Sequence, residues 1–191
     1  AQASPNIALI KYWGNRDDSL RLPSNGSLSI TLGGLHTTAR VSFDAAASED
    51  ALVIGGGPAP ADAAHRVSAH LELVRAAAGM STRARVESSS NFPADSGIAS
   101  SASAFAAITL AAAAACGLQL DEQMLSRLAR RGSGSACRSI FGGFVEWQAG
   151  DGDATSIAVP LAPPEHWRLT DLIAVVSQAP KKTGSTQGHQ F

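Results

Sequence analysis

The chain has 191 residues, a length that fits one domain, or one domain and part of a second. Its 15 Lys and Arg residues offset 16 Asp and Glu residues, and the formal net charge of -1 excludes a generally basic nucleic-acid binder. Charged residues make up only 16% of the chain and apolar residues 45%, which excludes a disordered chain. We therefore expect a globular protein.

The cysteines and the apolar segments give no sign of secretion or of a membrane. Cys116 and Cys137 lie outside any C-x-x-C pair, and two reduced thiols are typical of a cytosolic protein. Residues 1–6 lack the basic and then apolar pattern of a signal peptide. Residues 98–116 are rich in Ala and interrupted by Ser, too weakly apolar for lipid, and predict a buried helix. We expect a cytoplasmic protein with no membrane contact.

The first half of the chain reads mainly as strands. Apolar runs and alternating patterns predict strands over 6–13, 28–32, 37–43, 52–54 and 82–88. Between the last two, the helical spacing of Val67, Leu71 and Val74 predicts a helix over 62–78, and Gly79 is placed to end it.

The second half begins with the Ala-rich helix, which starts near Ser100 and is ended by Gly117. A shorter amphipathic helix is predicted over 121–131, and strands over 144–147, 156–159 and 172–176. Strands interleaved with single helices favour an α+β domain with a largely antiparallel or mixed sheet. The polar stretch near the end begins a new element, so we expect one domain over 1–178 and the start of a second over 179–191.

The loop before the Ala-rich helix has the composition of an anion site. Small residues dominate the range 91–103, so the backbone can approach a ligand, and the N-terminus of the following helix favours negative charge. No Gly-Lys-Ser/Thr follows, which excludes a Walker A loop. The same composition also suits an N-cap and a packing turn without a ligand.

A second anion-binding pattern lies at 132–138. Ser133 and Ser135 offer hydroxyls, Gly134 offers an open backbone, and Arg138 offers a fork suited to carboxylate or phosphate. The alternative is a surface loop with a solvated Arg. Lys11, at the end of the first strand, is a third candidate, although a Lys in such a place more often only extends its ammonium group into the solvent.

The histidines give no sign of a metal site. They stand at positions 36, 65, 70, 166 and 189, without metal-ligand spacing, and we expect them at the surface. Two anion loops and one Lys suggest a phosphorylated substrate, a nucleotide, or both.

Taken together, these stretches resemble the GHMP kinase superfamily and, within it, the mevalonate diphosphate decarboxylase family. The resemblance is carried by five motifs in order, which cover nearly the whole chain: 6–17, 22–32, 91–104, 129–147 and 181–188. It implies the GHMP kinase fold, with an N-terminal domain of the ribosomal protein S5 domain 2-like type that contains a left-handed βαβ crossover. The C-terminal domain would then be largely missing from this chain.

The resemblance also implies a reaction. ATP, with Mg²⁺, phosphorylates the 3-hydroxyl of a 5-phosphorylated mevalonate, and phosphate and carbon dioxide are then lost to give an isopentenyl product. Positive charge develops at the tertiary carbon, so the site must tolerate it between anions. The family's catalytic Asp belongs to the C-terminal domain, and we expect that this chain alone does not turn over. Members of the family often form homodimers, which nothing in the sequence tests.

Site residues follow from the resemblance, position by position. The ATP-binding set is Pro93, Ser96, Gly97, Ala99, Ser100, Ser101, Ala102 and Ser103, with Ser101 also contacting the metal. The substrate-binding set is Tyr12, Asn15, Ser133, Gly134, Ser135, Arg138 and Ser185. Three residues are implied in catalysis: Arg138 clamps the substrate carboxylate, Lys11 lies near the transferring phosphoryl group, and Asn6 orients the catalytic carboxylate.

One departure from the family pattern bears on the substrate. The diphosphate-specific enzymes usually carry a Lys where this chain has Asn15. Loss of that cation removes a charge-assisted hydrogen bond worth roughly 1.5–3 kcal/mol, or about ten- to a hundredfold in affinity. Our hypothesis is therefore a mevalonate 5-phosphate decarboxylase that makes isopentenyl phosphate. The alternatives are a diphosphomevalonate decarboxylase, a mevalonate 3-kinase and a nucleotide-binding relic without chemistry.

Overall fold

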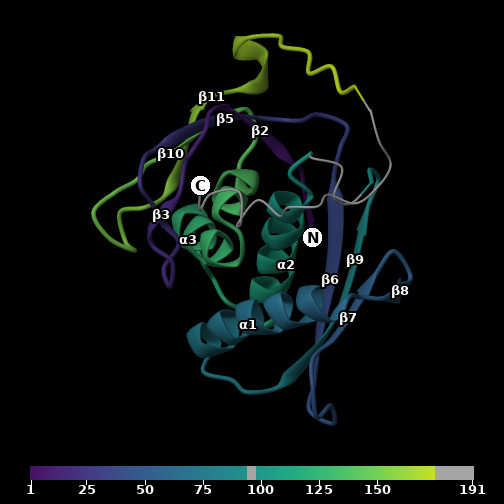
Figure 1. Ribbon diagram of the computed structural model, residues 1–191. Coiled ribbons are helices and arrows are strands. Elements are labelled where there is room, and N and C mark those ends of the chain that lie inside the picture. The colour runs from purple at the N-terminus through teal and green to yellow at the C-terminus, as the bar shows by residue number, and fades with distance from the viewer. Residues whose placement is uncertain (94–97, 175–191) are drawn as a thin grey trace.

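The computed structural model describes residues 1–93 and 98–174 as an α+β structure with two main sheets (Figure 1). The first sheet has five strands in the order β1-β6-β9-β7-β8. Its strands are β1 (Gln2–Ala3), β6 (Thr37–Asp44), β9 (Arg83–Ser90), β7 (Ala51–Ile54) and β8 (Gly57–Pro58). Neighbours are antiparallel except β7 and β9, which run parallel and are joined through α1 (Ala61–Ala78). The left-handed βαβ crossover that the resemblance implies stays a prediction.

The second sheet has four antiparallel strands in the order β11-β10-β5-β2. They are β11 (Ala158–Ala162), β10 (Phe144–Trp147), β5 (Ser27–Thr31) and β2 (Asn6–Ile10). A small separate hairpin, β3 (Asn15–Asp17) with β4 (Leu22–Pro23), follows β2 in the chain. This hairpin is called the β3–β4 hairpin below.

The helices α1, α2 (Ser100–Ala115) and α3 (Glu122–Gly132) and the 3-10 helix η1 (Gly134–Ile140) lie between the two sheets (Figure 1). The 3-10 helix η2 (Pro164–His166) follows β11 and lies outside them. α2 packs on β6 of the first sheet, while η1 packs on α2 and, on its other side, on β2, β10 and β11. Because most buried side chains of α2 are Ala, the neighbouring elements approach it closely.

Most predicted elements are confirmed to within a few residues. The buried Ala-rich helix is α2, and Gly79 and Gly117 adopt the left-handed conformation just after α1 and α2, as predicted. The helix predicted over 121–131 is α3, which begins where Asp121 Oδ1 accepts a hydrogen bond from the Met124 N–H at 2.7 Å.

Two strand predictions are wrong in part. The strand predicted over 6–13 ends at Ile10, after an irregularity in its pairing with β5, and the chain turns at Gly14 with φ of 69°. The strand predicted over 172–176 is absent at 172–174, where Leu172 is 91% exposed and has no strand beside it to pair with. Residues 175–176 and the predicted second domain over 179–191 lie outside the described residues.

The expectation that all histidines lie at the surface is wrong for His70. Its side chain is buried, its Nε2 shares a hydrogen bond of 2.8 Å with Thr109 Oγ1, and its ring meets Phe105 edge to face. Burial, with the charges of Arg131 and Arg21, lowers the pKa of His70 to about 4. His70 is therefore a neutral core residue, whereas His65 on the same helix is exposed. His189 lies outside the described residues.

His70 makes the stability of the protein depend on pH. In the unfolded chain His70 becomes protonated below a pH of about 6.5, whereas in the folded chain it stays neutral down to about pH 4. The free energy of unfolding therefore falls as the pH falls through this window, by about 3 kcal/mol in total. In His70→Gln, which keeps a donor for Thr109, we expect a flatter dependence in urea unfolding between pH 7 and pH 4.5. The control His65→Gln should keep the wild-type slope, and an equally steep slope in His70→Gln would contradict this assignment.

Candidate active site

Arg138 is the centre of the candidate site and is 2% exposed. Its guanidinium is held by β5 and β2: Nε donates to Ser29 Oγ at 2.9 Å, Nη2 donates to Asn6 Oδ1 at 3.1 Å, and Nη1 donates to Ser27 Oγ. The Trp147 ring lies beneath it, 5.9 Å from Cζ to the ring centroid. The surface-loop alternative, with a solvated Arg, is therefore wrong.

No carboxylate of the described residues forms an ion pair with Arg138. Burial lowers the pKa of its guanidinium, and an unpaired buried charge is costly. Of the five guanidinium N–H groups, three are donated to protein oxygens, which leaves one on each Nη. An Arg binds a carboxylate through a pair of N–H groups, and these two N–H groups offer such a pair, so the site is suited to an anion supplied by a ligand.

Asn6 positions Arg138. Its Nδ2 donates to the Ser135 carbonyl at 3.0 Å and to Ser139 Oγ at 2.8 Å, while its Oδ1 accepts from Arg138. The amide has then used all of its hydrogen-bonding capacity within this domain. Its implied role in orienting a catalytic carboxylate stays a prediction, because that group belongs to a second domain.

Tyr12 and Gly134 form one wall of the site. The Tyr12 ring packs edge-on against Trp147, with centroids 4.8 Å apart, and burial raises the pKa of its hydroxyl, which keeps it a neutral donor. A Cβ on Gly134 would lie 2.7 Å from Tyr12 Oη and 3.2 Å from the Trp147 ring. Only glycine fits at position 134, where η1 meets these two aromatic rings.

The two predicted anion loops meet at a pair of serines. Ser101 in the first turn of α2 and Ser133, which links α3 to η1, have their hydroxyl oxygens 3.3 Å apart. The residues are 32 positions apart in the chain, so only the fold brings them together. This contact places the 91–103 loop, called the phosphate loop below, beside the 132–138 loop, called the substrate loop below.

The start of α2 has the form of an anion site. Its N-cap, Ala99, adopts a left-handed conformation with φ of 48° and has no side chain that can cap the first turn. The positive end of the helix dipole, at Ser100 and Ser101, favours an anion. Ser96 and Gly97, in the same loop, lie outside the described residues, and Pro93 is exposed.

The ATP-binding prediction is less well supported for the next two residues of α2. The side chains of Ala102 and Ser103 are buried, and the Ser103 hydroxyl bonds Thr37 Oγ1 at 2.7 Å and the Ser100 carbonyl at 3.1 Å. The N–H of Ala102 donates to the Ala99 carbonyl at 2.9 Å. These groups serve the core, and ATP binding by Ser100, Ser101, Ala102 and Ser103 stays a prediction.

Two further predicted residues lie beside β2. Lys11 is exposed directly after the strand, and its carbonyl accepts from Asn25 Nδ2 at 3.0 Å. Asn15 begins the β3–β4 hairpin, where its Nδ2 donates to Asp18 Oδ1 at 2.9 Å and its Oδ1 is buried without a partner. Ser135 is half-buried in η1, and Ser185 lies outside the described residues.

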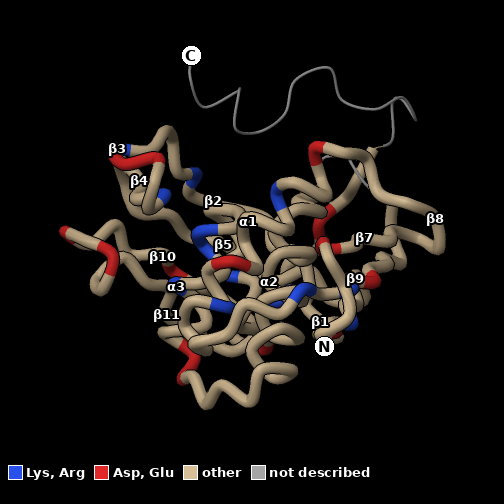
Figure 2. Tube along the Cα trace, turned by 90° about the horizontal axis from the view of Figure 1, so that it is seen from below, with Lys and Arg blue, Asp and Glu red and all other residues tan. Residues whose placement is uncertain are grey.

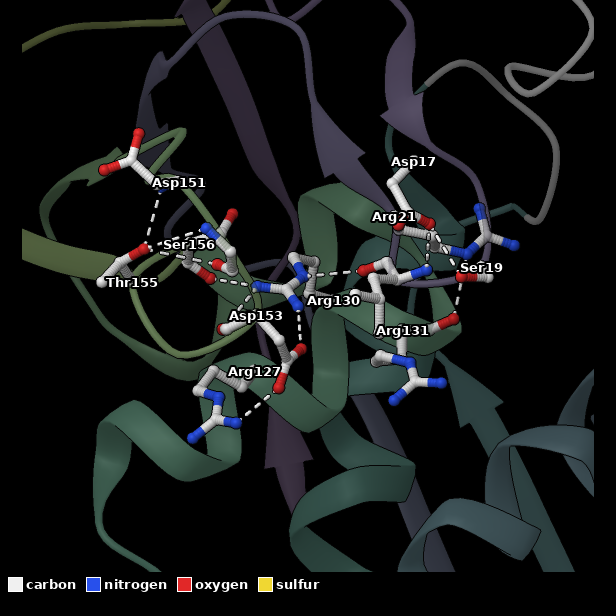
Figure 3. Close-up of polar contacts among 12 residues, drawn as sticks. Asp17, Ser19, Arg21, Arg127, Arg130, Arg131, Asp151, Asp153, Thr155 and Ser156 are labelled. Atoms are coloured by element: carbon white, nitrogen blue, oxygen red, sulfur yellow. Dashed lines mark hydrogen bonds and ion pairs between the residues drawn. The ribbon is translucent and has the colours of Figure 1, made fainter.

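Sequence reasoning missed the residues that hold the site together. Ser27 and Ser29 alternate on β5 and face Arg138, a signal visible only once Arg138 is known to be buried. Figure 3 shows Arg130 at the centre of a second network. Its guanidinium forms an ion pair with Asp153 of the β10–β11 loop and donates to the Leu20 carbonyl of the β3–β4 hairpin at 3.1 Å. One fully buried side chain thus joins α3, this hairpin and this loop.

The comparisons with known proteins agree with this geometry. The protein-family model described as the diphosphomevalonate decarboxylase-like N-terminal domain matches residues 3–158. The chain belongs to this family. The diphosphomevalonate decarboxylase of Ganoderma lucidum is 42% identical over 209 residues, which cover 100% of this chain and 52% of that protein.

Solved structures of the family share the fold. The mevalonate diphosphate decarboxylase from Staphylococcus aureus has a TM-score of 0.89 and 40% identity, over 99% of this chain and 57% of that one. MDDEF in complex with MVAPP, AMPPCP and magnesium has a TM-score of 0.81 and 48% identity, over 84% of this chain and 49% of that one. The chain therefore spans about half the length of the relatives it matches.

Within residues 1–93 and 98–174, no three His, Cys, Asp or Glu side chains are grouped to hold a metal ion. In the same ranges no helix is both long and apolar enough to cross a bilayer.

Gly134→Ala tests the packing of the site. A methyl group would clash with Tyr12 Oη, so we expect a loss of about 1–3 kcal/mol in the free energy of unfolding and an altered near-ultraviolet circular dichroism of Tyr12 and Trp147. Gly142→Ala is the matched control, because a Cβ there meets nothing within 4 Å. If both variants unfold like the wild type, the wall is not as tight as described.

Proposed function

We propose that the protein containing this chain is an ATP- and Mg²⁺-dependent decarboxylase of mevalonate 5-diphosphate. One observation carries the proposal: Arg138 is a buried cation that pairs with no carboxylate of residues 1–93 and 98–174, and it lies beside two loops suited to phosphate. Membership in the family and the names of the relatives support the same reaction class. Because the chain spans about half of each relative, the activity is proposed for the whole protein.

The phosphate loop would hold the nucleotide. The residues present fit it, since the first turn of α2 has no capping side chain and Ser101 offers a hydroxyl to Mg²⁺ or its water. ATP with Mg²⁺ supplies the phosphoryl group that makes the tertiary hydroxyl a good leaving group. Ser100 and Ser101 would orient the phosphates, and Lys11, exposed directly after β2, is the cation proposed for the transferring phosphoryl group. The proposed contacts of Pro93, Ser96, Gly97 and Ala99 belong to the same loop.

Arg138 would hold the substrate carboxylate. The three hydrogen bonds to Asn6, Ser27 and Ser29 fix the guanidinium plane, so the bound carboxylate is oriented before the reaction. The carbon–carbon bond to be broken is then held in line with the departing oxygen. Carbon dioxide leaves as a neutral molecule, and the bonding electrons form the double bond of the product.

The 5-phosphate end would lie against the Tyr12 wall. Tyr12, Ser133 and Ser135 would offer hydroxyls, and the backbone N–H of Gly134 would offer a further donor to the phosphate oxygens. Ser185 is proposed for the same pocket on the resemblance alone.

The size of the 5-phosphate group separates two candidate substrates. The relatives are named diphosphomevalonate decarboxylases, which favours the diphosphate over the monophosphate that we expected from the sequence. The monophosphate remains a second candidate because position 15 is neutral, and its amide nitrogen is already bonded to Asp18. A cytoplasmic location and a homodimer also stay predictions.

Arg138→Gln tests the proposal in the full-length protein. Truncating a buried, hydrogen-bonded cation costs about 2–5 kcal/mol, so kcat/KM for decarboxylation should fall at least about thirtyfold. ATP binding, followed by titration calorimetry, should change little, because the phosphate loop is intact. Arg40→Gln, at an exposed position on β6, is the control.

Near-normal release of carbon dioxide by Arg138→Gln would remove Arg138 from the reaction. Binding of ATP and substrate by the wild type without release of phosphate would favour the nucleotide-binding relic instead.

A further inference from the structure

Arg21 lies on the β3–β4 hairpin in a conformation that non-glycine residues rarely adopt, with φ of 49°. Such a backbone is costly and persists only where the surroundings hold it. The surroundings do so here: the Arg21 N–H bonds the Asp18 carbonyl at 3.3 Å, and Arg130 bonds the neighbouring Leu20 carbonyl. The position and direction of the Arg21 side chain are therefore set by the hairpin.

The Arg21 side chain reaches the substrate loop. Its Nε donates to the Arg131 carbonyl at 2.9 Å, at the end of α3 and two residues before Ser133 (Figure 3). No carboxylate in the described ranges pairs with Arg21, and its two terminal nitrogens have no described partner. The guanidinium is half-buried, so its charge is less screened than that of a surface Arg.

Arg21 acts electrostatically on other groups near the site. Its charge acts on Tyr12, where it opposes the effect of burial on the hydroxyl pKa, and on Arg66 of α1, whose pKa it lowers together with burial. The charge of Arg138 acts on the same Tyr12 hydroxyl. Figure 2 shows basic positions around β4, β2 and α1, and acidic positions at β3. An Arg that has no carboxylate partner among the described residues and lies beside the proposed phosphate pocket favours an anion there.

We propose that Arg21 is a specificity-determining residue that binds the terminal phosphate of the substrate's 5-diphosphate, in place of a cation at Asn15. The inference rests on the proposed function. Both residues lie on the β3–β4 hairpin, where Asn15 pairs with Pro23, two residues after Arg21. Nε of Arg21 is anchored on the Arg131 carbonyl, and its Nη1 and Nη2 offer the pair of donors that a phosphate accepts.

The experiment compares Arg21→Gln with the wild type in the full-length protein. We expect kcat/KM for mevalonate 5-diphosphate to fall about ten- to a hundredfold, mainly through KM, and kcat/KM for mevalonate 5-phosphate to change less than about threefold. Adding Asn15→Lys to Arg21→Gln should restore the preference for the diphosphate. Arg21→Asn, which tolerates the left-handed backbone, checks that the loss is not caused by strain. Arg40→Gln is the matched control.

Two results would overturn the inference: an equal loss for both substrates, which would indicate a structural role, and no loss for either. Calorimetric binding of mevalonate 5-diphosphate without ATP separates the inference from the proposed function. If the wild type binds the diphosphate without turning it over, and Arg21→Gln binds it more weakly, the role of Arg21 is supported and the decarboxylase activity is contradicted. If Arg21→Gln binds the diphosphate as tightly as the wild type does, only the role of Arg21 is contradicted. If the wild type neither binds nor turns over the diphosphate, both the role of Arg21 and the decarboxylase activity are contradicted.

Discussion

The site depends on one constraint, which is a buried guanidinium that no carboxylate in the described part of the chain neutralises. Arg138 lies on η1, and its position is set from three sides by the Asn6 amide and the hydroxyls of Ser27 and Ser29. These neutral acceptors hold the group without neutralising it, so the domain keeps a positive charge in its interior. Such a charge is costly in the free protein and favourable once an anion arrives. The strands β2 and β5 therefore serve the chemistry as much as the core.

The rest of the domain brings phosphate-binding groups to that charge. The small side chains of α2 let η1 pack close to it, which places Ser101 beside Ser133. Arg130 ties the β3–β4 hairpin to α3, so Asn15 and Arg21 are held near the same loop. Each of these contacts joins segments far apart in the chain.

Local patterns predicted the helices and most strands because each carries its own periodicity, as in α1 and β6. They did not predict that β2 ends at Ile10, since pairing irregularities depend on the partner strand. Arg138 was named from the sequence, but its burial and its serine partners on β5 were not visible there. His70 was wrongly predicted at the surface for the same reason, because a single polar residue in a helix does not show which elements pack against it. The network of Arg130 needs three segments to be assembled before it can be seen.

The most direct test is the stoichiometry of the reaction in the full-length protein, with ATP, Mg²⁺ and mevalonate 5-diphosphate. Carbon dioxide and inorganic phosphate would be measured in the same sample as ADP. Our account predicts that all three appear in equal amounts. Formation of ADP and a phosphorylated acid without carbon dioxide would show a kinase instead, and would contradict the role given to the buried Arg138.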